Sequence, residues 1–152
     1  MKNLFDSDRV TEIQQRLANL KADARPLWGI MNAPQAMAHC SAGLETAFGD
    51  RLLPRMRLGR IIGWIIKPTV MGDDKPFRRN SATIPGLAMS GVNGLEFEAE
   101  RKKLSTLIDR FAAEGPRTCT THPHSFFGTL APDEWAILMY KHLDHHLRQF
   151  GA

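Results

Sequence analysis

The stretch that decides the fold is APDEWAILMYKHLDHHLRQF, residues 131–150, which holds three of the six histidines of the chain. Successive residues of an α-helix turn by about 100°. One face of this segment therefore collects apolar side chains and two histidines: Trp135, Met139, His142, His146 and Phe150. Charged residues fall on the opposite face: Lys141, Asp144 and Arg148. The pattern predicts an amphipathic helix whose apolar face, with its histidines, turns inward.

His142 and His146 stand four residues apart, a spacing that lets two imidazoles on adjacent helical turns bind one metal ion. The alternative is that both rings lie at a helix interface and form ordinary hydrogen bonds there. A metal site would still need a third ligand. His145 lies at the border of the apolar face, either as a ligand-supporting or proton-relay group or as a hydrogen-bonded edge histidine.

Three further segments have helical spacing, and turn signals separate them. We expect helices near residues 7–22, capped by Ser7, near 33–49, capped by Asn32, and near 95–113, in addition to 131–150. No pair of segments alternates as strands of a hairpin do. The sequence therefore predicts an all-α chain, a four-helix bundle with a long crossover between its second and third helices.

The crossover covers residues 51–92, about forty residues, where two to eight are usual between bundle helices. We expect its apolar residues to cap one end of the core: Ile61, Ile62, Trp64 and Ile65. Seven basic residues also gather there: Arg55, Arg57, Arg60, Lys67, Lys75, Arg78 and Arg79. They either attract an anionic substrate or form a solvated basic cover.

Composition narrows the classes of function. The 152 residues suit one domain, residues 1–152, and a net charge of +4 is only mildly basic. Aromatic residues are not interleaved with basic ones as in nucleic-acid sites, so we expect no nucleic-acid partner. The start of the chain is not a secretory signal, the apolar run Ile61–Ile66 is too short for a membrane span, and the two cysteines form no framework. We expect a cytoplasmic protein without a membrane partner.

Spacing alone does not decide the role of the three remaining histidines. His39 lies beside the apolar stripe of its predicted helix, among small neighbours such as Ala36 and Gly43, which leave room for another helix or a ligand. His122 and His124 lie in the loop HPHSFFG, with a proline between them. These loop histidines either bind a metal or fix the loop over the mouth of the bundle.

The run HPHSFFGTLAPDEWAILMYKHLDHHLRQFG resembles the C-terminal block of an uncharacterised bacterial subfamily of the DinB-like superfamily, and WGIMNAPQAMAHC resembles that superfamily's second helix. The superfamily includes YfiT-like metal-dependent hydrolases and bacillithiol and mycothiol transferases. Two departures are Ala131, where a capping Thr or Ser is expected, and the longer HPHSFFG in place of HPFFG. The resemblance implies a four-helix bundle with a crossover between helices two and three.

The resemblance also implies a divalent metal held by one histidine of helix two and an HxxxH pair of helix four, here His39, His142 and His146. Four residues are expected to support the site or line its pocket: His124, His145, Met139 and Trp135. Three imidazoles suit zinc, nickel, iron or manganese and leave a coordination position open. No catalytic residue follows from the sequence.

Two classes of function remain open at this stage. One is a metal-dependent enzyme, a thiol S-transferase or hydrolase acting on a small molecule such as a thiol. The other is a non-catalytic metal-binding or stress-response bundle. We also expect a homodimer, because Ile137 projects from the charged side of its helix and the crossover exposes apolar residues if it does not fold back.

Overall fold

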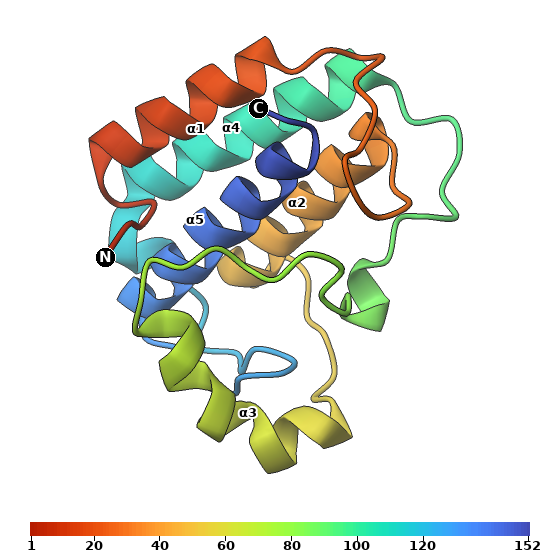
Figure 1. The fold of residues 1–152 in the computed structure, drawn as a ribbon. Coiled ribbons are helices and arrows are strands. Elements are labelled where there is room, and N and C mark those ends of the chain that lie inside the picture. The colour runs from red at the N-terminus through yellow and green to blue at the C-terminus, as the bar shows by residue number, and fades with distance from the viewer.

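The computed structural model describes residues 1–152 and is all-helical, without a strand. The chain forms five α-helices and two short 3₁₀ helices: α1 (Ser7–Asn19), α2 (Ala33–Phe48), α3 (Arg57–Met71), η1 (Pro85–Leu87), α4 (Phe97–Glu114), η2 (Gly115–Thr118) and α5 (Pro132–Gln149). Figure 1 shows how the α-helices are arranged. The all-α prediction is confirmed. The four predicted helices are present as α1, α2, α4 and α5, with ends within three residues of those expected, whereas α3 was not predicted.

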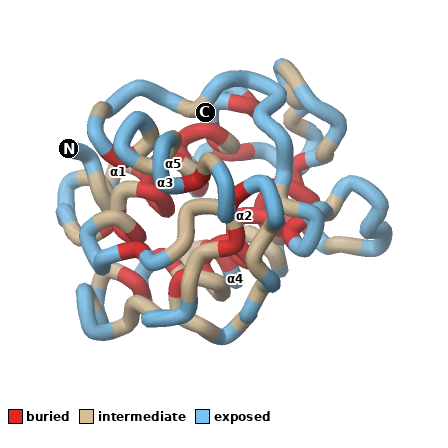
Figure 2. Tube along the Cα trace, turned by 90° about the horizontal axis from the view of Figure 1, so that it is seen from below, coloured by how far each residue is buried: buried red, intermediate tan, exposed pale blue.

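Helices α1, α2, α4 and α5 form one packed unit, the four-helix core. Helix α2 packs against α4 and α5, and α1 packs against the same two helices. Each contributes fully buried side chains: Ile13 and Leu17, Met37 and Leu44, Ile108 and Phe111, and Trp135 and Ala136. In Figure 2 the buried stretches lie in the middle of the trace and the exposed ones form its outline. Burial of these apolar faces is the main stabilising contribution.

Side-chain caps determine where the helices begin. Helix α1 is capped by Asp6, not by Ser7 as predicted, since the Asp6 carboxylate accepts the Asp8 amide. In α2 the Asn32 and Gln35 side chains bond reciprocally to each other's backbone amides, a capping box. Ala131 lacks a capping hydroxyl, and the Glu134 carboxylate compensates in part by accepting the Ala131 amide at 2.8 Å. The helices that carry His39 and His142 therefore start at defined positions.

The crossover differs from the prediction, because its apolar segment forms α3 and does not cap the core. Gly59 and Gly63 are the buried positions of its first turns and lie directly against the backbone of Phe126. A Cβ at either glycine would overlap the Phe126 carbonyl oxygen. The glycine side of α3 thus allows close approach to the loop 119–131, and Ile61, Trp64 and Ile65 are left exposed on the opposite side.

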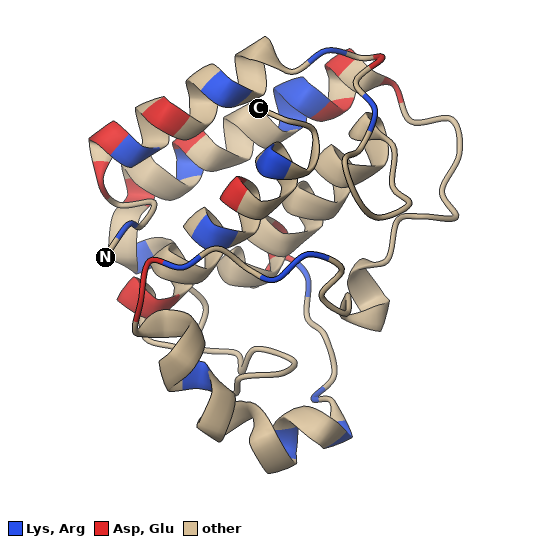
Figure 3. Ribbon diagram, viewed as in Figure 1, with Lys and Arg blue, Asp and Glu red and all other residues tan.

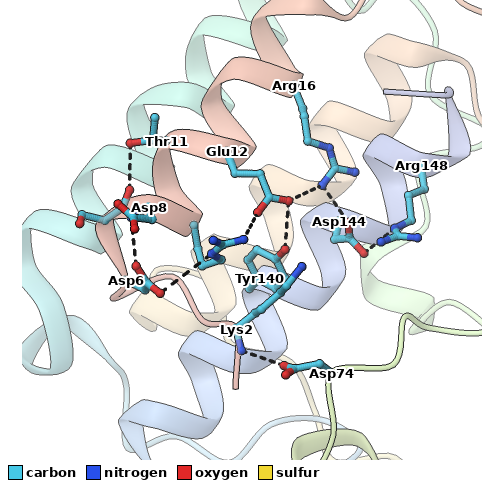
Figure 4. A network of polar contacts seen from close by, with 12 residues as sticks. Lys2, Asp6, Asp8, Thr11, Glu12, Arg16, Asp74, Tyr140, Asp144 and Arg148 are labelled. Atoms are coloured by element: carbon cyan, nitrogen blue, oxygen red, sulfur yellow. Dashed lines mark hydrogen bonds and ion pairs between the residues drawn. The ribbon is translucent and has the colours of Figure 1, made fainter.

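Two charged residues of α5 that the helical pattern places outward are buried in the structure, Lys141 and Asp144. Lys141 donates from Nζ to the carbonyl oxygens of Val70 and Asp73, so it ties the end of α3 to α5. Asp144 accepts from Arg16 of α1 at 2.8 Å and from Arg148 at 2.8 Å, within the network drawn in Figure 4. These polar contacts therefore tie α5 to both α3 and α1.

The structure also bears on Ile137 and on the apolar character of the helices. Ile137 does not project freely: it is half-buried and packs against the core, so that part of the argument for a dimer was wrong. No helix combines the length and the apolar character that crossing a bilayer requires.

Candidate metal centre

His39 of α2 and His142 and His146 of α5 meet between the two helices. Each offers one ring nitrogen, and these three atoms lie within 4.8 Å of one another. The three ring centroids are 4.7 to 4.9 Å apart and the rings meet edge to face. His39 is buried, whereas His142 and His146 are only half-buried. His39 is thus brought together with two histidines that lie 103 and more positions later in the sequence.

A glycine makes room for this cluster. A Cβ on Gly43 of α2 would lie 2.9 Å from Cε1 and Nδ1 of the His142 ring, and real Cβ contacts are rarely so close. Because Gly43 stands one turn after His39, α2 can approach α5 closely where the imidazoles meet. The small neighbours of His39 noted in the sequence therefore accommodate a ring from another helix.

Hydrogen bonds orient two of the rings. Nδ1 of His39 lies 2.7 Å from the Leu87 carbonyl oxygen, and Nδ1 of His146 lies 2.8 Å from Oε1 of Gln149. An oxygen acceptor requires that each Nδ1 carry the proton, so the lone pair of each ring is on Nε2; in His39 this nitrogen accepts a hydrogen bond from Nε2 of His142 at 2.8 Å. Supporting acceptors of this kind are usual behind metal-binding histidines. Gln149 is itself fixed, since its Nε2 donates to the Trp28 carbonyl at 2.7 Å.

The surroundings keep the three imidazoles neutral. Burial lowers the pKa of His39, and burial together with the nearby His39 ring lowers the pKa of His146 to about 3. The pKa of His142 lies well below its usual value, chiefly because of burial and secondly because of the neighbouring histidines. Neutral imidazole is the form that binds a metal, so protons do not compete for these nitrogens near pH 7.

The donor set fits a divalent ion. Nε2 of His39 and Nε2 of His142 are 2.8 Å apart. Two nitrogens on a tetrahedral zinc ion, at about 2.0–2.1 Å each, would stand roughly 3.3 Å apart. Nε2 of His39 and Nε2 of His142 would separate by about half an ångström on binding, whereas ligand atoms as far as 4.8 Å apart would approach each other, and rotation of the side chains allows both movements. Three protein nitrogens without a fourth ligand match open catalytic sites more closely than closed structural ones. The cluster can thus hold a metal ion.

Nearly the whole chain, including the three histidines of the cluster, matches one family of proteins. The sequence matches the family described as Protein of unknown function (DUF1569) over residues 4–152. The chain belongs to this family. The comparisons with curated proteins and with solved structures give no match. The description assigns no activity to DUF1569, and the histidine cluster is the feature of this DUF1569 chain that indicates its chemistry.

His145 forms one wall of the histidine cluster and is not among its converging ligands. Its ring lies 5.0 Å from that of His146, 5.7 Å from Trp28 and 6.0 Å from Phe77, measured between centroids. The Arg79 guanidinium stands 4.6 Å over the Trp28 ring. The outer side of the site is therefore aromatic, with one exposed cation at its rim.

The loop histidines separate into an inner and an outer one. Nδ1 of His124 accepts the backbone amides of Phe126 and Phe127, so Nε2 carries its proton, and the ring meets Trp135 edge-on at 5.5 Å. Burial, reinforced by the cation of Arg55, lowers the pKa of His124 to about 4. His122 is exposed. His124 thus fixes the loop at Phe126 and Phe127 against Trp135 of α5. Met139 is buried one turn before His142.

The sequence did not reveal the roles of three residues of the site: Gln149 beside His146, Leu87 beside His39 and Gly43 beside His142. Gln149 follows His146 by three positions on the same helix, a detectable signal for a side chain that supports a ligand. Leu87 acts through its backbone carbonyl at the end of a long crossover, and its side-chain type carries no such information.

We predict that Gln149→Leu weakens metal binding by about 10- to 100-fold, because the Nδ1 proton of His146 loses its acceptor. Gln149→Glu keeps the acceptor for His146 but loses the donor to the Trp28 carbonyl, so it should weaken binding less than Gln149→Leu does. Metal titration gives the affinities, and ¹⁵N spectra of the imidazoles show which nitrogen of His146 is protonated. The exposed Gln15→Leu is the control, with unchanged affinity. Equal losses in the Leu and Glu variants would refute the role of the acceptor.

We predict that His124 makes the metal-free protein less stable in acid. Its folded pKa of about 4 is below the ordinary 6.5, so between these values the unfolded chain binds a proton that the folded chain does not. The contribution of His124 to the free energy of unfolding is fully present above pH 6.5. It falls by up to about 1.4 kcal/mol per pH unit as the pH decreases toward 4. His124→Asn keeps an acceptor for the loop amides. The slope of its unfolding free energy against pH should be smaller by the contribution of about one proton, which denaturant titrations at several pH values measure. An unchanged slope would contradict the assignment.

Proposed function

We propose that His39, His142 and His146 together bind one divalent metal ion and that this protein is a metal-dependent enzyme acting on a small molecule, of the thiol S-transferase or hydrolase type. The observation that carries the proposal is the convergence of three neutral imidazole nitrogens within 4.8 Å. The resemblance of AMAHC and HLDHH to the metal-binding segments of the DinB-like superfamily supports it. With that resemblance we assign the chain to a single-domain DinB-type four-helix bundle.

When bound, the ion would lower the pKa of a water molecule or a thiol at its open position. The residues of the chain have separate tasks. His39 and His146 are held in the required tautomer by Leu87 and Gln149, and His142 adds the third imidazole from the turn of α5 before His146. Zinc, nickel, iron and manganese all accept three imidazoles.

The surroundings suggest what the substrate contacts. His145 is the further histidine whose ring packs on a ligand ring, and we assign it to holding or moving a proton beside the site. Trp28 and Phe77 offer apolar faces to the organic part of a substrate. Arg79 supplies a positive charge at the rim, which suits an anionic group. The proposal places the protein in the cytoplasm and includes neither a nucleic-acid nor a membrane partner.

One observation favours the second candidate, a non-catalytic metal-binding or stress-response bundle. No carboxylate belongs to the cluster, and both oxygens of the nearby Asp144 are bound elsewhere, one by Arg16 of α1 and the other by Arg148 of α5 itself. A general base of the carboxylate type is therefore absent from the cluster. Under this candidate the protein still binds one metal ion but leaves small thiols and esters unchanged.

We predict one divalent metal per chain in protein purified without chelators, and loss of most of it in His39→Ala, His142→Ala and His146→Ala, because two imidazoles do not define the geometry of the ion. Elemental analysis measures the content. His122→Ala is the matched control, an exposed histidine that should keep full metal. Retention of metal in all three variants would remove the site. Loss only in the control would move it to the loop.

A further inference from the structure

A small polar cavity, the loop cavity, lies between the loop 119–131, α2 and the start of α5. Its volume is about 10 Å³, which leaves room for at least one water-sized group. Its polar lining comes from segments that are distant in sequence: Thr46 of α2, Arg51 after it, His122, His124 and Ser125 of the loop, and Trp135 of α5. None of the three clustered histidines lines the loop cavity, so it is separate from the candidate metal centre.

Two N–H groups of this lining have no acceptor within the chain. Trp135 is 1% exposed, and its buried Nε1–H makes no hydrogen bond. Nδ1 of His124 accepts the amides of Phe126 and Phe127, so the proton of this ring is on Nε2, which also has no acceptor in the protein. Native structures rarely leave buried donors unpaired. These two donors therefore indicate that the loop cavity holds an acceptor from outside the chain.

The charge beside the loop cavity is positive. Arg55 is half-buried and donates from Nη1 to the His124 carbonyl oxygen at 2.6 Å, but it forms no ion pair. The loop contains no carboxylate, and the carboxylate of Glu45 is already paired with Arg51 and Lys103. Figure 3 shows basic residues along the connection from α2 to α3, which contributes to the cavity lining. A half-buried cation thus stands beside the two donors without a counter-ion.

We propose that the loop cavity binds one small anion, which accepts hydrogen bonds from Trp135 and His124 and offsets the charge of Arg55. A water molecule would satisfy the donors but leave the arginine without a counter-ion, so the charge favours an anion. The size of the cavity suits a halide ion or one oxygen of a carboxylate. Because its walls belong to the loop and to two core helices, the anion would hold the loop on the core. The inference does not depend on metal binding.

The first test is a titration with sodium chloride and, separately, with sodium formate, at an ionic strength held constant with a bulky sulfonate. The three indole N–H signals of the chain are followed in ¹H–¹⁵N spectra and assigned with Trp→Phe variants. We expect a saturable shift of the Trp135 signal, and the anion that produces it distinguishes a halide from a carboxylate. Trp64 is the internal control, since its Nε1 already donates to the Ile61 carbonyl oxygen at 3.0 Å. If neither anion shifts Trp135 saturably, the occupant is water and the inference is wrong.

The second test concerns the charge of Arg55. Arg55→Gln keeps a donor but removes the charge, so the dissociation constant of the bound anion should rise by about 10-fold or more. Arg57→Gln is the matched control: it removes the same charge from an exposed arginine and should leave the constant unchanged. Equal losses in the two variants would reduce the effect to general charge attraction and overturn the site.

The third test uses stability. A saturating concentration of the anion should raise the Tm of the unchanged protein, because a ligand that binds only the folded chain stabilises it. Trp135→Phe keeps an aromatic ring but lacks one donor, so its Tm should rise clearly less, whereas Trp64→Phe should respond as the unchanged protein does. The same rise of Tm in all three proteins would contradict a site at Trp135.

Discussion

The close approach of α2 and α5 is the constraint on which the rest of the structure depends. Three imidazoles that belong to two helices occupy one small volume, and each must be neutral and oriented. Gly43 permits the approach because any larger residue would displace the His142 ring. The apolar contacts of the four-helix core hold the helices together without a metal, so the cluster is formed by folding and is ready to accept an ion.

The remaining segments support this arrangement from outside. Arg16 of α1 binds Asp144, and Lys141 binds the end of α3, so charges on the flanks of α5 fix how the helix is rotated. The crossover supplies Leu87 to His39, and the turn at Trp28 and Gly29 holds Gln149, which bonds to His146. Gly29 has φ +76°, and a Cβ there would lie 2.7 Å from the Gln149 amide nitrogen. Distant loops thus set the tautomers of two proposed ligands.

Much of this could be predicted from the sequence, and the exceptions have physical causes. The helical stripe of α5 placed His142 and His146 inward, and the resemblance of AMAHC added His39; the structure brings all three together. Periodicity failed for α3 because it records which side of a helix is apolar, and here that side faces solvent while two glycines pack inward. It failed for Lys141 and Asp144 because a helical pattern does not show which charges a neighbouring segment will cover and pair.

The central claim is that one metal ion is bound by three imidazoles with a position left open, and the most direct measurement is X-ray absorption at the metal edge of the protein as purified. The account predicts a first shell of nitrogen or oxygen only, with the multiple-scattering pattern of three imidazoles, and a change in that shell when a small thiol such as mercaptoethanol is added. A first shell containing sulfur before thiol is added, or fewer than three imidazoles, would contradict it.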